Sequence, residues 1–394
     1  MGKVIVHIDL NAFFARAEEI RNPSLEGKPV AIGHDGRSGI VSTCSYAARK
    51  FGVSSGMPMF KAKELCPQLI IKPVDFRYYG GLSRVFFNFV KSYTHLVEIA
   101  SVDECFADFT EVVKKQTNIE QFFRQMQNDL FAKTRLKCSI GVAATKFLAK
   151  MGSDYQKPMG LTIIRKRDIP RILYPLPIDK MYGIGRKTAP RLKSIGILTI
   201  GDLASRCASD NHELINILGK FYYVIKDWIS GKGSDEVIFK PEESKSIGSS
   251  STFHHDTNNI EEIRYMFENL AKEVSSRAVK ENRLGTTIQI TAKEATFISH
   301  NKSITFDNPT NDYRFIYQTA IKLYENNYLP LTVRLVGVTL QNLIDPRDMA
   351  IQMSLFNYQE AEEESQTKLL INELNRKLKK PSLIRASEAK KKDK

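Results

Sequence analysis

The stretch Ser101-Val102-Asp103-Glu104-Cys105-Phe106-Ala107-Asp108 places two adjacent carboxylates between two short apolar runs. Residues 96–100 form the run before the pair and residues 105–109 the run after it. The pattern predicts a hairpin of two strands with Asp103 and Glu104 at its tip. Neighbouring carboxylates both stay ionised only where cations or strong donors lie beside them. A site made of oxygen ligands alone suits a hard divalent cation such as magnesium. The alternative is that Asp103 and Glu104 lie in an ordinary solvent-exposed turn.

A third carboxylate ends another apolar run. The run Val4-Ile5-Val6-His7-Ile8 leads to Asp9, and a helix-like segment follows over residues 11–18. Taken alone, Asp9 could simply cap that helix. The elements around Asp9 follow the order of a β-α-β-β-α-β unit, which favours a role for Asp9 other than helix capping. The predicted strands are 4–9, 97–101, 105–109 and 138–143, and the predicted helices are 79–94 and 119–133.

This order is that of a ferredoxin-like sheet, in which the first strand lies beside the third. The C-terminal end of the first strand then shares an edge with the hairpin, so Asp9, Asp103 and Glu104 are expected to converge. Three converging carboxylates are most simply a site for two metal ions, roughly 3.5–4 Å apart, that clamp an in-line phosphoryl transfer.

The composition narrows the class of partner. The chain has 394 residues, room for several domains, and a net charge of +14, which predicts a polyanionic partner such as nucleic acid. No apolar run approaches the roughly 18 residues of a membrane helix, and no signal peptide is recognised. The five cysteines are scattered without metal-site spacing, which favours a reducing, cytoplasmic location over a disulfide framework or a zinc site.

An insertion between residues 10 and 79 interrupts the first unit. Within it, residues 39–53 read as a short strand that runs into a helix, with Tyr46 and Arg49 three residues apart on one face. The arginine fork and the tyrosine hydroxyl suit phosphate oxygens, although an ordinary exposed helix would also fit the pattern.

Several of these motifs, in this order and spacing, resemble the Y-family translesion DNA polymerases, most closely the DinB or polymerase IV type. The resemblance spans about residues 3–345. The residues that carry it are Asp9 with Asn11-Ala12-Phe13-Phe14-Ala15, Tyr46-Ala47-Ala48-Arg49-Lys50-Phe51-Gly52-Val53, Ser101-Val102-Asp103-Glu104 and Lys157-Pro158-Met159-Gly160.

The resemblance implies roles for individual residues. Asp9, Asp103 and Glu104 would be catalytic and would hold two Mg²⁺ ions, with the Leu10 carbonyl as a further ligand. Phe13, Phe14, Tyr46, Arg49 and Lys157 would bind the incoming nucleotide, and Phe14 would be the sugar gate that excludes a ribose 2′-hydroxyl. Phe13 and Phe14 could instead be core residues of an amphipathic helix, an alternative that suits Phe13 better. Ala12, Ser42 and Cys44 are small residues at the positions where this family covers the nascent base pair, and they would leave open space above it, an open roof. Incorrect base pairs would then meet few repulsive contacts, so copying would have low fidelity.

Residues 181–197 resemble a helix-hairpin-helix. In that motif, glycines let backbone N–H groups approach a DNA phosphate without reading sequence. Gly183, Gly185, Arg186 and Lys187 are the expected DNA-binding residues, against the alternative of a plain helical turn. Tyr182 stands where the family's motif leads us to expect proline, which puts the rigidity of the turn in question.

The C-terminal part repeats the β-α-β-β-α-β order after a glycine-rich and charged tether, and it resembles the family's little finger. Ser249-Ser250 lacks the charged pair usual in its first strand, which predicts a weaker grip on the DNA backbone there. The cluster His254-His255-Asp256 could suggest a metal site, but no fourth ligand lies nearby in the sequence.

A short motif lies beyond this domain. Gln352-Met353-Ser354-Leu355-Phe356 resembles the bacterial sliding-clamp peptide, in which Gln352 would anchor one end while Leu355 and Phe356 fill an apolar pocket. Peptides that match so short a pattern also arise by chance. The basic end of the chain reads as a solvated tail.

Together these observations predict an α+β, multidomain, right-hand polymerase with a ferredoxin-like palm. Its partners would be primer-template DNA, dNTP and a sliding clamp, with no membrane association, no proofreading activity and a monomeric state. The alternatives are a non-catalytic DNA-binding scaffold, a nucleotidyl cyclase and the UmuC-type branch of the same family. The predicted domains are the palm (1–10 and 78–166), small fingers (11–77), helix-hairpin-helix thumb (167–231), linker (232–245), little finger (246–345) and tail (346–394).

Overall fold

The computed structural model describes residues 2–208, 211–239, 243–348 and 374. The chain forms two compact units, Met1–Glu242 and Glu243–Lys394. The described part of each unit has a hydrophobic core of its own, and each contains a sheet of the predicted β-α-β-β-α-β order. The predicted clamp peptide, with Gln352, Leu355 and Phe356, lies outside the described residues.

A five-stranded sheet organises the first unit, with β1 at its centre. Its order is β5-β6-β1-β7-β8, and every pair is antiparallel except β7 with β8. The prediction that the first strand lies beside the third is therefore confirmed. The strands are β1 (Ile5–Leu10), β5 (Val97–Ile99), β6 (Glu104–Asp108), β7 (Cys138–Ala143) and β8 (Leu161–Ile164).

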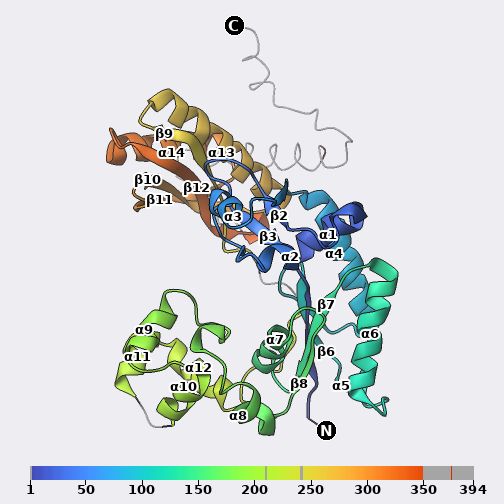
Figure 1. Cartoon of the computed structure of the whole chain (residues 1–394). Helices are drawn as coiled ribbons and strands as arrows, with labels where there is room; N and C mark the ends of the chain where they lie inside the picture. Colours follow the sequence, from blue (N-terminus) through green and yellow to red (C-terminus); the bar gives the residue numbers. More distant parts are fainter. Residues whose placement is uncertain (1, 209–210, 240–242, 349–373, 375–394) are drawn as a thin grey trace. The chain divides into compact units, whose positions relative to one another are not determined.

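The two faces of this sheet are covered by different helices. Side chains alternate along a strand, so Val6, Ile8 and Leu10 share a core with α4 (Phe76–Lys91) and α6 (Ile119–Thr134). Ile5 belongs to the core on the other face, where α7 (Lys146–Tyr155) lies (Figure 1). Asp9 follows Ile5 by four residues and therefore points to the α7 face. A short helix, α5 (Thr110–Val113), follows β6.

Helix α7 was not predicted from the sequence. Gly152 and Ser153 interrupt its apolar pattern and weaken its helix propensity. Glycines on both sides of the contact let α7 lie directly on β7: a side chain at Gly141 would collide with the carbonyl of Ala149, and one at Gly152 would come within 3.0 Å of the Gly141 Cα. Thr145 caps the helix by accepting the N–H of Leu148.

The insertion forms a small three-stranded sheet of order β3-β2-β4 with its own core. The predicted strand-to-helix step is present as β3 and α2, whereas β2 and β4 were not predicted. The elements are α1 (Phe13–Arg21), η1 (Pro23–Leu25), β2 (Val30–Gly33), β3 (Val41–Cys44), α2 (Tyr46–Arg49), α3 (Met59–Leu65) and β4 (Ile70–Lys72).

A helical segment completes the first unit and shares the hydrophobic core beneath α7. Residues 232–239, the first part of the predicted linker (232–245), lie against this unit. Ser234 accepts a hydrogen bond from the Lys146 N–H, the Ile238 N–H donates to Glu98, and Val237 is buried. The helices are η2 (Lys166–Asp168), α8 (Ile169–Ile172), η3 (Ile178–Lys180), α9 (Thr188–Ser194), α10 (Ile200–Cys207), α11 (His212–Leu218) and α12 (Phe221–Ile229).

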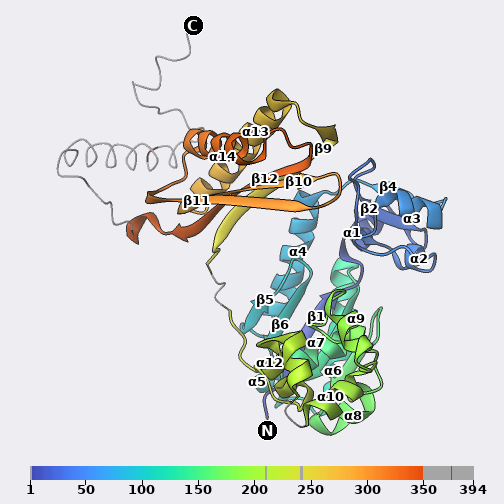
Figure 2. The same ribbon diagram turned by 90° about the vertical axis from the view of Figure 1, so that its left-hand side faces the viewer.

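The second unit is an antiparallel sheet of order β11-β10-β12-β9 with two helices on one face (Figure 2). Its apolar residues, including Phe267, Ile288 and Val338, form a single buried cluster. The elements are β9 (Ser246–Thr257), α13 (Ile260–Lys280), β10 (Leu284–Glu294), β11 (Ser299–Thr310), α14 (Tyr313–Tyr328), β12 (Val333–Ile344) and η4 (Pro346–Asp348). None of the helices in the described ranges has the length and apolar character that crossing a membrane requires.

Candidate active site

The backbone brings the three predicted carboxylates to one edge of the central sheet. Asp9 and Glu104 are cross-strand partners in the β1–β6 register, and the Leu10 N–H donates to the Asp103 carbonyl over 2.9 Å. The structure corrects one detail of the prediction: Glu104 is the first residue of β6, whereas Asp103 lies in the turn before it. The hairpin therefore places one acid beside Asp9 and the other at the corner.

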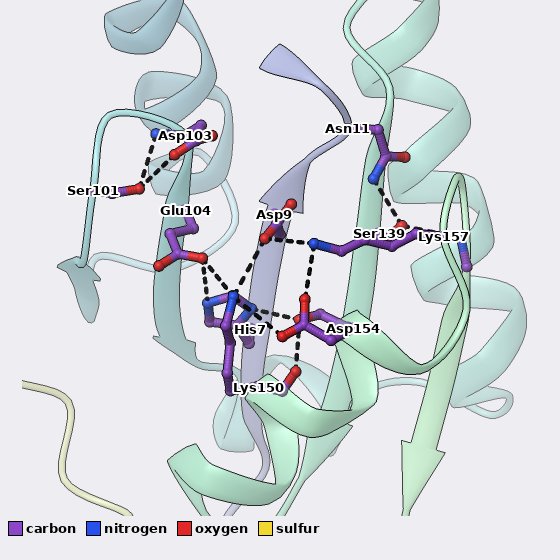
Figure 3. A network of polar contacts seen from close by, with 12 residues as sticks. His7, Asp9, Asn11, Ser101, Asp103, Glu104, Ser139, Lys150, Asp154 and Lys157 are labelled. Carbon is purple, nitrogen blue, oxygen red and sulfur yellow. Dashed lines mark hydrogen bonds and ion pairs between the residues drawn. The ribbon is translucent and has the colours of Figure 1, made fainter. Parts of the chain in front are cut away.

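Two lysines neutralise this acidic edge (Figure 3). The Lys150 Nζ lies 2.6 Å from Glu104 Oε2 and 3.3 Å from Asp9 Oδ2. The Lys157 Nζ lies 2.8 Å from the same Asp9 oxygen and 2.8 Å from Asp154 Oδ1. A contact of 3.5 Å between Lys150 and Asp154 Oδ2 completes a closed ring of alternating charges. Sequence reasoning found Lys157 but missed Lys150 and Asp154, although their four-residue spacing on one helix face was the available signal.

The pKa values of the acids and lysines at this edge reflect their burial and the charges around them. Burial raises the pKa of the Asp103 and Glu104 carboxyl groups, and the charge of Asp9 adds to the rise. Burial alone would lower the pKa of Lys150 and Lys157, but the surrounding carboxylates outweigh it and raise both values. The two lysines therefore stay charged at neutral pH, and the charge of Lys150 partly opposes the rise in the pKa of Asp103 and Glu104.

The oxygen ligands at this edge suit a hard divalent cation, although the acidic side chains are held by other protein groups in this structure. Asp103 accepts a hydrogen bond from the Ser101 hydroxyl, and Glu104 is held by Lys150. As they stand, the side chains of the described residues form no group of three His, Cys, Asp or Glu residues at metal-binding distance. The carboxylates and the Leu10 carbonyl offer oxygen alone, and the two ammonium groups show that positive charge is favourable here.

A cavity of about 360 Å³ opens beside these acids. It brings together most of the predicted nucleotide-site residues with Asp9 and Asp103. Cys44 is an exception to the predicted open roof, because it is fully buried in the core of the small sheet. Thr43, Ser55 and Val102 were not predicted. The lining residues are Asp9, Leu10, Ala12, Phe13, Phe14, Ser42, Thr43, Tyr46, Arg49, Ser55, Val102, Asp103 and Lys157.

One part of the cavity lining is suited to an anion. Ser45 caps α2, so Tyr46 and Arg49 lie on its single turn, with the Arg49 guanidinium 4.8 Å from the centre of the Tyr46 ring. Burial raises the pKa of Tyr46, so its hydroxyl keeps its proton. Within the described residues this buried hydroxyl has no hydrogen-bond partner. A buried donor without a partner is costly, so a ligand oxygen would be a favourable acceptor.

The two phenylalanines at the start of α1 have different surroundings. Phe13 is buried in the sheet core, with 1% of its surface exposed. Phe14 is half-buried and stacks on Tyr79, whose hydroxyl donates to Glu18 over 3.0 Å. The Phe14 ring is therefore held at the cavity wall by a partner that is itself fixed.

Asn11 connects the end of β1 to the loop that carries Lys157. Its Nδ2 donates to Ser139 Oγ over 2.9 Å, and its Oδ1 accepts the Met159 N–H over 2.8 Å. The side chain is almost fully buried. Sequence reasoning used Asn11 only as part of a motif, because its partners lie more than a hundred residues away along the chain.

The predicted helix-hairpin-helix turn is fixed against α7. Gly183 has a positive φ of 89°, and a side chain there would approach the Phe221 ring to 2.6 Å. Tyr182 stacks on Trp228 with ring centres 5.8 Å apart, and its N–H donates to the Met151 sulfur. These contacts provide the rigidity that proline would otherwise give. Gly185 has open space around its Cβ position.

Comparison with known families and sequences adds independent evidence. Residues 8–154 match the impB/mucB/samB family, residues 166–197 match the IMS family HHH motif, and residues 244–355 match the impB/mucB/samB family C-terminal domain. The DNA polymerase IV of Bacillus velezensis is 38% identical over 99% of this chain and 95% of its own length. DNA polymerase IV 1 of Bacillus subtilis is 38% identical, with coverages of 95% and 91%.

Solved structures agree with the sequences. A Y-family DNA polymerase chimera of Dbh and Dpo4 has a TM-score of 0.77 and 29% identity, and the match covers 87% of this chain and 99% of that one. An insertion ternary complex of Dbh DNA polymerase, also 29% identical, has a TM-score of 0.58 with the same coverages. Members of this family generally use divalent metal ions. The chain belongs to the Y family of DNA polymerases, the impB/mucB/samB family, and its relatives place it in the DinB or DNA polymerase IV branch.

Proposed function

We propose that this chain is a DNA-directed DNA polymerase that performs template-directed, low-fidelity translesion synthesis without proofreading. One observation carries the proposal. Asp9, the cross-strand partner of Glu104, lines one cavity together with Asp103 and the side chains proposed to bind phosphate, Tyr46, Arg49 and Lys157. The family, the relatives and the charge of the chain support the same function.

Asp9, Asp103 and Glu104, with the Leu10 carbonyl, would hold two Mg²⁺ ions. When bound, such ions lower the pKa of the primer 3′-hydroxyl and stabilise the charge of the departing pyrophosphate. The protein side chains orient these oxygens: the β1–β6 register fixes Asp9 against Glu104, and the corner places Asp103 at the cavity. Asp103, which lies at the corner beside the cavity, would be a ligand of both ions.

The nucleotide would lie along the cavity. Arg49 and the Tyr46 hydroxyl donate to phosphate oxygens, and Lys157 adds a charge from the palm side. Phe14 would occupy the space that a ribose 2′-hydroxyl needs, and its stacking on Tyr79 keeps it there. Small side chains at Ala12 and Ser42 would leave room above the base pair, so incorrect or damaged pairs meet few repulsive contacts.

Primer-template DNA would be held mainly through its phosphates. Gly183 and Gly185, with Arg186 and Lys187, would present backbone N–H groups and positive charge to the duplex. We keep the predicted assignments for the palm (1–10 and 78–166), fingers (11–77), thumb (167–231) and little finger (246–345). Residues 352–356 would bind a sliding clamp.

Primer extension on two templates tests this function. With Mg²⁺, the protein should add the matched nucleotide on an undamaged template and continue past an abasic site, and EDTA should stop both reactions. Tight primer-template binding without any extension would instead support a non-catalytic scaffold. Extension that stops at the abasic site would remove the translesion assignment but leave the polymerase.

A further inference from the structure

Helix α7 carries two lysines that contact the β5–β6 hairpin in parallel ways. Lys146 pairs with Glu98 of β5 over 2.6 Å, and Lys150, one helical turn later, pairs with Glu104 of β6 over the same 2.6 Å. Both ammonium groups are largely shielded, with 18% and 12% of the side chain exposed. The two ion pairs therefore have similar length and burial on one helix.

Lys150 differs from Lys146 in what surrounds it. Its ammonium group also contacts Asp9 Oδ2 at 3.3 Å and Asp154 Oδ2 at 3.5 Å, so three carboxylates converge on it (Figure 3). Asp9 and Glu104 are cross-strand neighbours, and like charges in that position repel one another. The ammonium group offsets this repulsion at the place where the proposed function needs a divalent cation.

We propose that Lys150 is a positioning residue, whose ammonium group holds the Asp9 and Glu104 carboxylates together in the metal-free enzyme and competes with the divalent cation for them. The inference rests on the proposed function, in which those two carboxylates are metal ligands. The competition is direct, because Lys150 uses oxygens of the same two carboxylates that a cation would take.

Asp154 gives the displaced lysines another acceptor. It lies outside the proposed ligand set, yet one of its oxygens faces Lys150 and the other faces Lys157 at 2.8 Å. If the Asp9 carboxylate were engaged by a cation, both ammonium groups would keep Asp154 as an ion-pair partner. Lys157 would then be available to a phosphate while it stays beside the site.

Mn²⁺ binding to the full-length protein, followed by the electron paramagnetic resonance signal of free Mn²⁺ without DNA or nucleotide, tests the inference. Lys150→Met keeps the side-chain length but removes the charge, so its Mn²⁺ dissociation constant should fall at least about tenfold, the step expected for losing one nearby competing charge. Lys150→Arg, which keeps the charge, should stay near the wild-type value. Lys146→Met, the matched control on the same helix, should also leave Mn²⁺ affinity unchanged.

Thermal unfolding supplies a second measurement on the same proteins. In EDTA, Lys150→Met and Lys146→Met should both unfold at lower temperature than the wild type. Mg²⁺ should restore Lys150→Met towards the wild-type value but leave the loss in Lys146→Met in place. A Lys150→Met protein that folds only with Mg²⁺ is the extreme form of this result, whereas one unfolded in both conditions would contradict the proposal.

Two outcomes separate this inference from the proposed function. If Asp103→Asn abolishes Mn²⁺ binding while Lys150→Met binds Mn²⁺ no more tightly than the wild type, the role of Lys150 is wrong and the metal site stands. If Mn²⁺ binding survives Asp103→Asn, the metal is not at these carboxylates, and both assignments fail.

Discussion

The ring of Phe14 stacks on the ring of Tyr79, with centroids 4.5 Å apart and planes 16° from parallel. Tyr79 is itself fully buried and fixed by its hydrogen bond to Glu18. The side chain proposed to select the sugar therefore rests on a rigid support, which a steric filter requires.

Phe14→Ala should admit ribonucleotides. Removing the ring opens the space beside the sugar, so the preference for dNTP over rNTP should fall by about 10–200-fold, the range that one small steric contact provides. Steady-state incorporation of matched dNTP and rNTP pairs measures it. Phe13→Leu, in the neighbouring core position, should lower the unfolding temperature and leave the sugar preference as it is. An unchanged preference in Phe14→Ala would remove the sugar-gate role.

The two glycines of the hairpin turn should respond differently to alanine. Gly183→Ala meets both a positive φ and the Phe221 ring, so it should destabilise the fold by more than about 1 kcal/mol in denaturant unfolding. Gly185→Ala has free space in the protein and should fold normally. Its extra methyl group should nevertheless hinder the approach of a DNA phosphate and weaken duplex binding in fluorescence anisotropy. Equal duplex affinity for Gly185→Ala and wild type would argue against phosphate contact at this turn.

Asn11→Ala should loosen the loop that carries Lys157. It leaves the Met159 N–H without its partner and removes one of the two donors to the buried Ser139 hydroxyl, at a stability cost of about 1–3 kcal/mol. Because Lys157 is proposed to contact the triphosphate, KM for dNTP should rise several-fold while kcat changes less. A loss of stability with no change in KM would show that Asn11 supports the fold alone.

Deletion of residues 352–356 should separate two activities. Synthesis by the free enzyme should be unaffected, because the proposed site lies within residues 9–157. Stimulation by a sliding clamp loaded on primed DNA should disappear. Stimulation that survives the deletion would place the clamp contact elsewhere in the chain.

Much of the fold follows from local pattern. Apolar alternation and turn residues predicted both β-α-β-β-α-β units, and the strand order then placed Asp9 beside the hairpin acids, as the β1–β6 register shows. Tyr46 and Arg49 were predicted to share a face because three residues on a helix make nearly one turn.

The features that the sequence did not reveal depend on distant contacts. Lys150 meets Glu104 and Asp9 across separations of 46 and 141 residues, and no local pattern encodes such a pair. Helix α7 was missed because the small residues that let it lie on β7 also weaken its helical pattern. Glu98 and Lys146 hold the first part of the predicted linker through hydrogen bonds to its backbone. Every sequence has the same backbone groups, so these contacts leave no signal in the amino-acid pattern.

Single-turnover incorporation of one matched nucleotide, measured beside primer-template affinity, tests the central claim most directly. Asp103→Ala should reduce the incorporation rate at least about a thousand-fold, because it removes a carboxylate proposed to hold both cations. Its affinity for primer-template should stay within a few-fold of the wild type. An Asp103→Ala protein that retains most of its rate at normal DNA affinity would contradict the assignment of the active site.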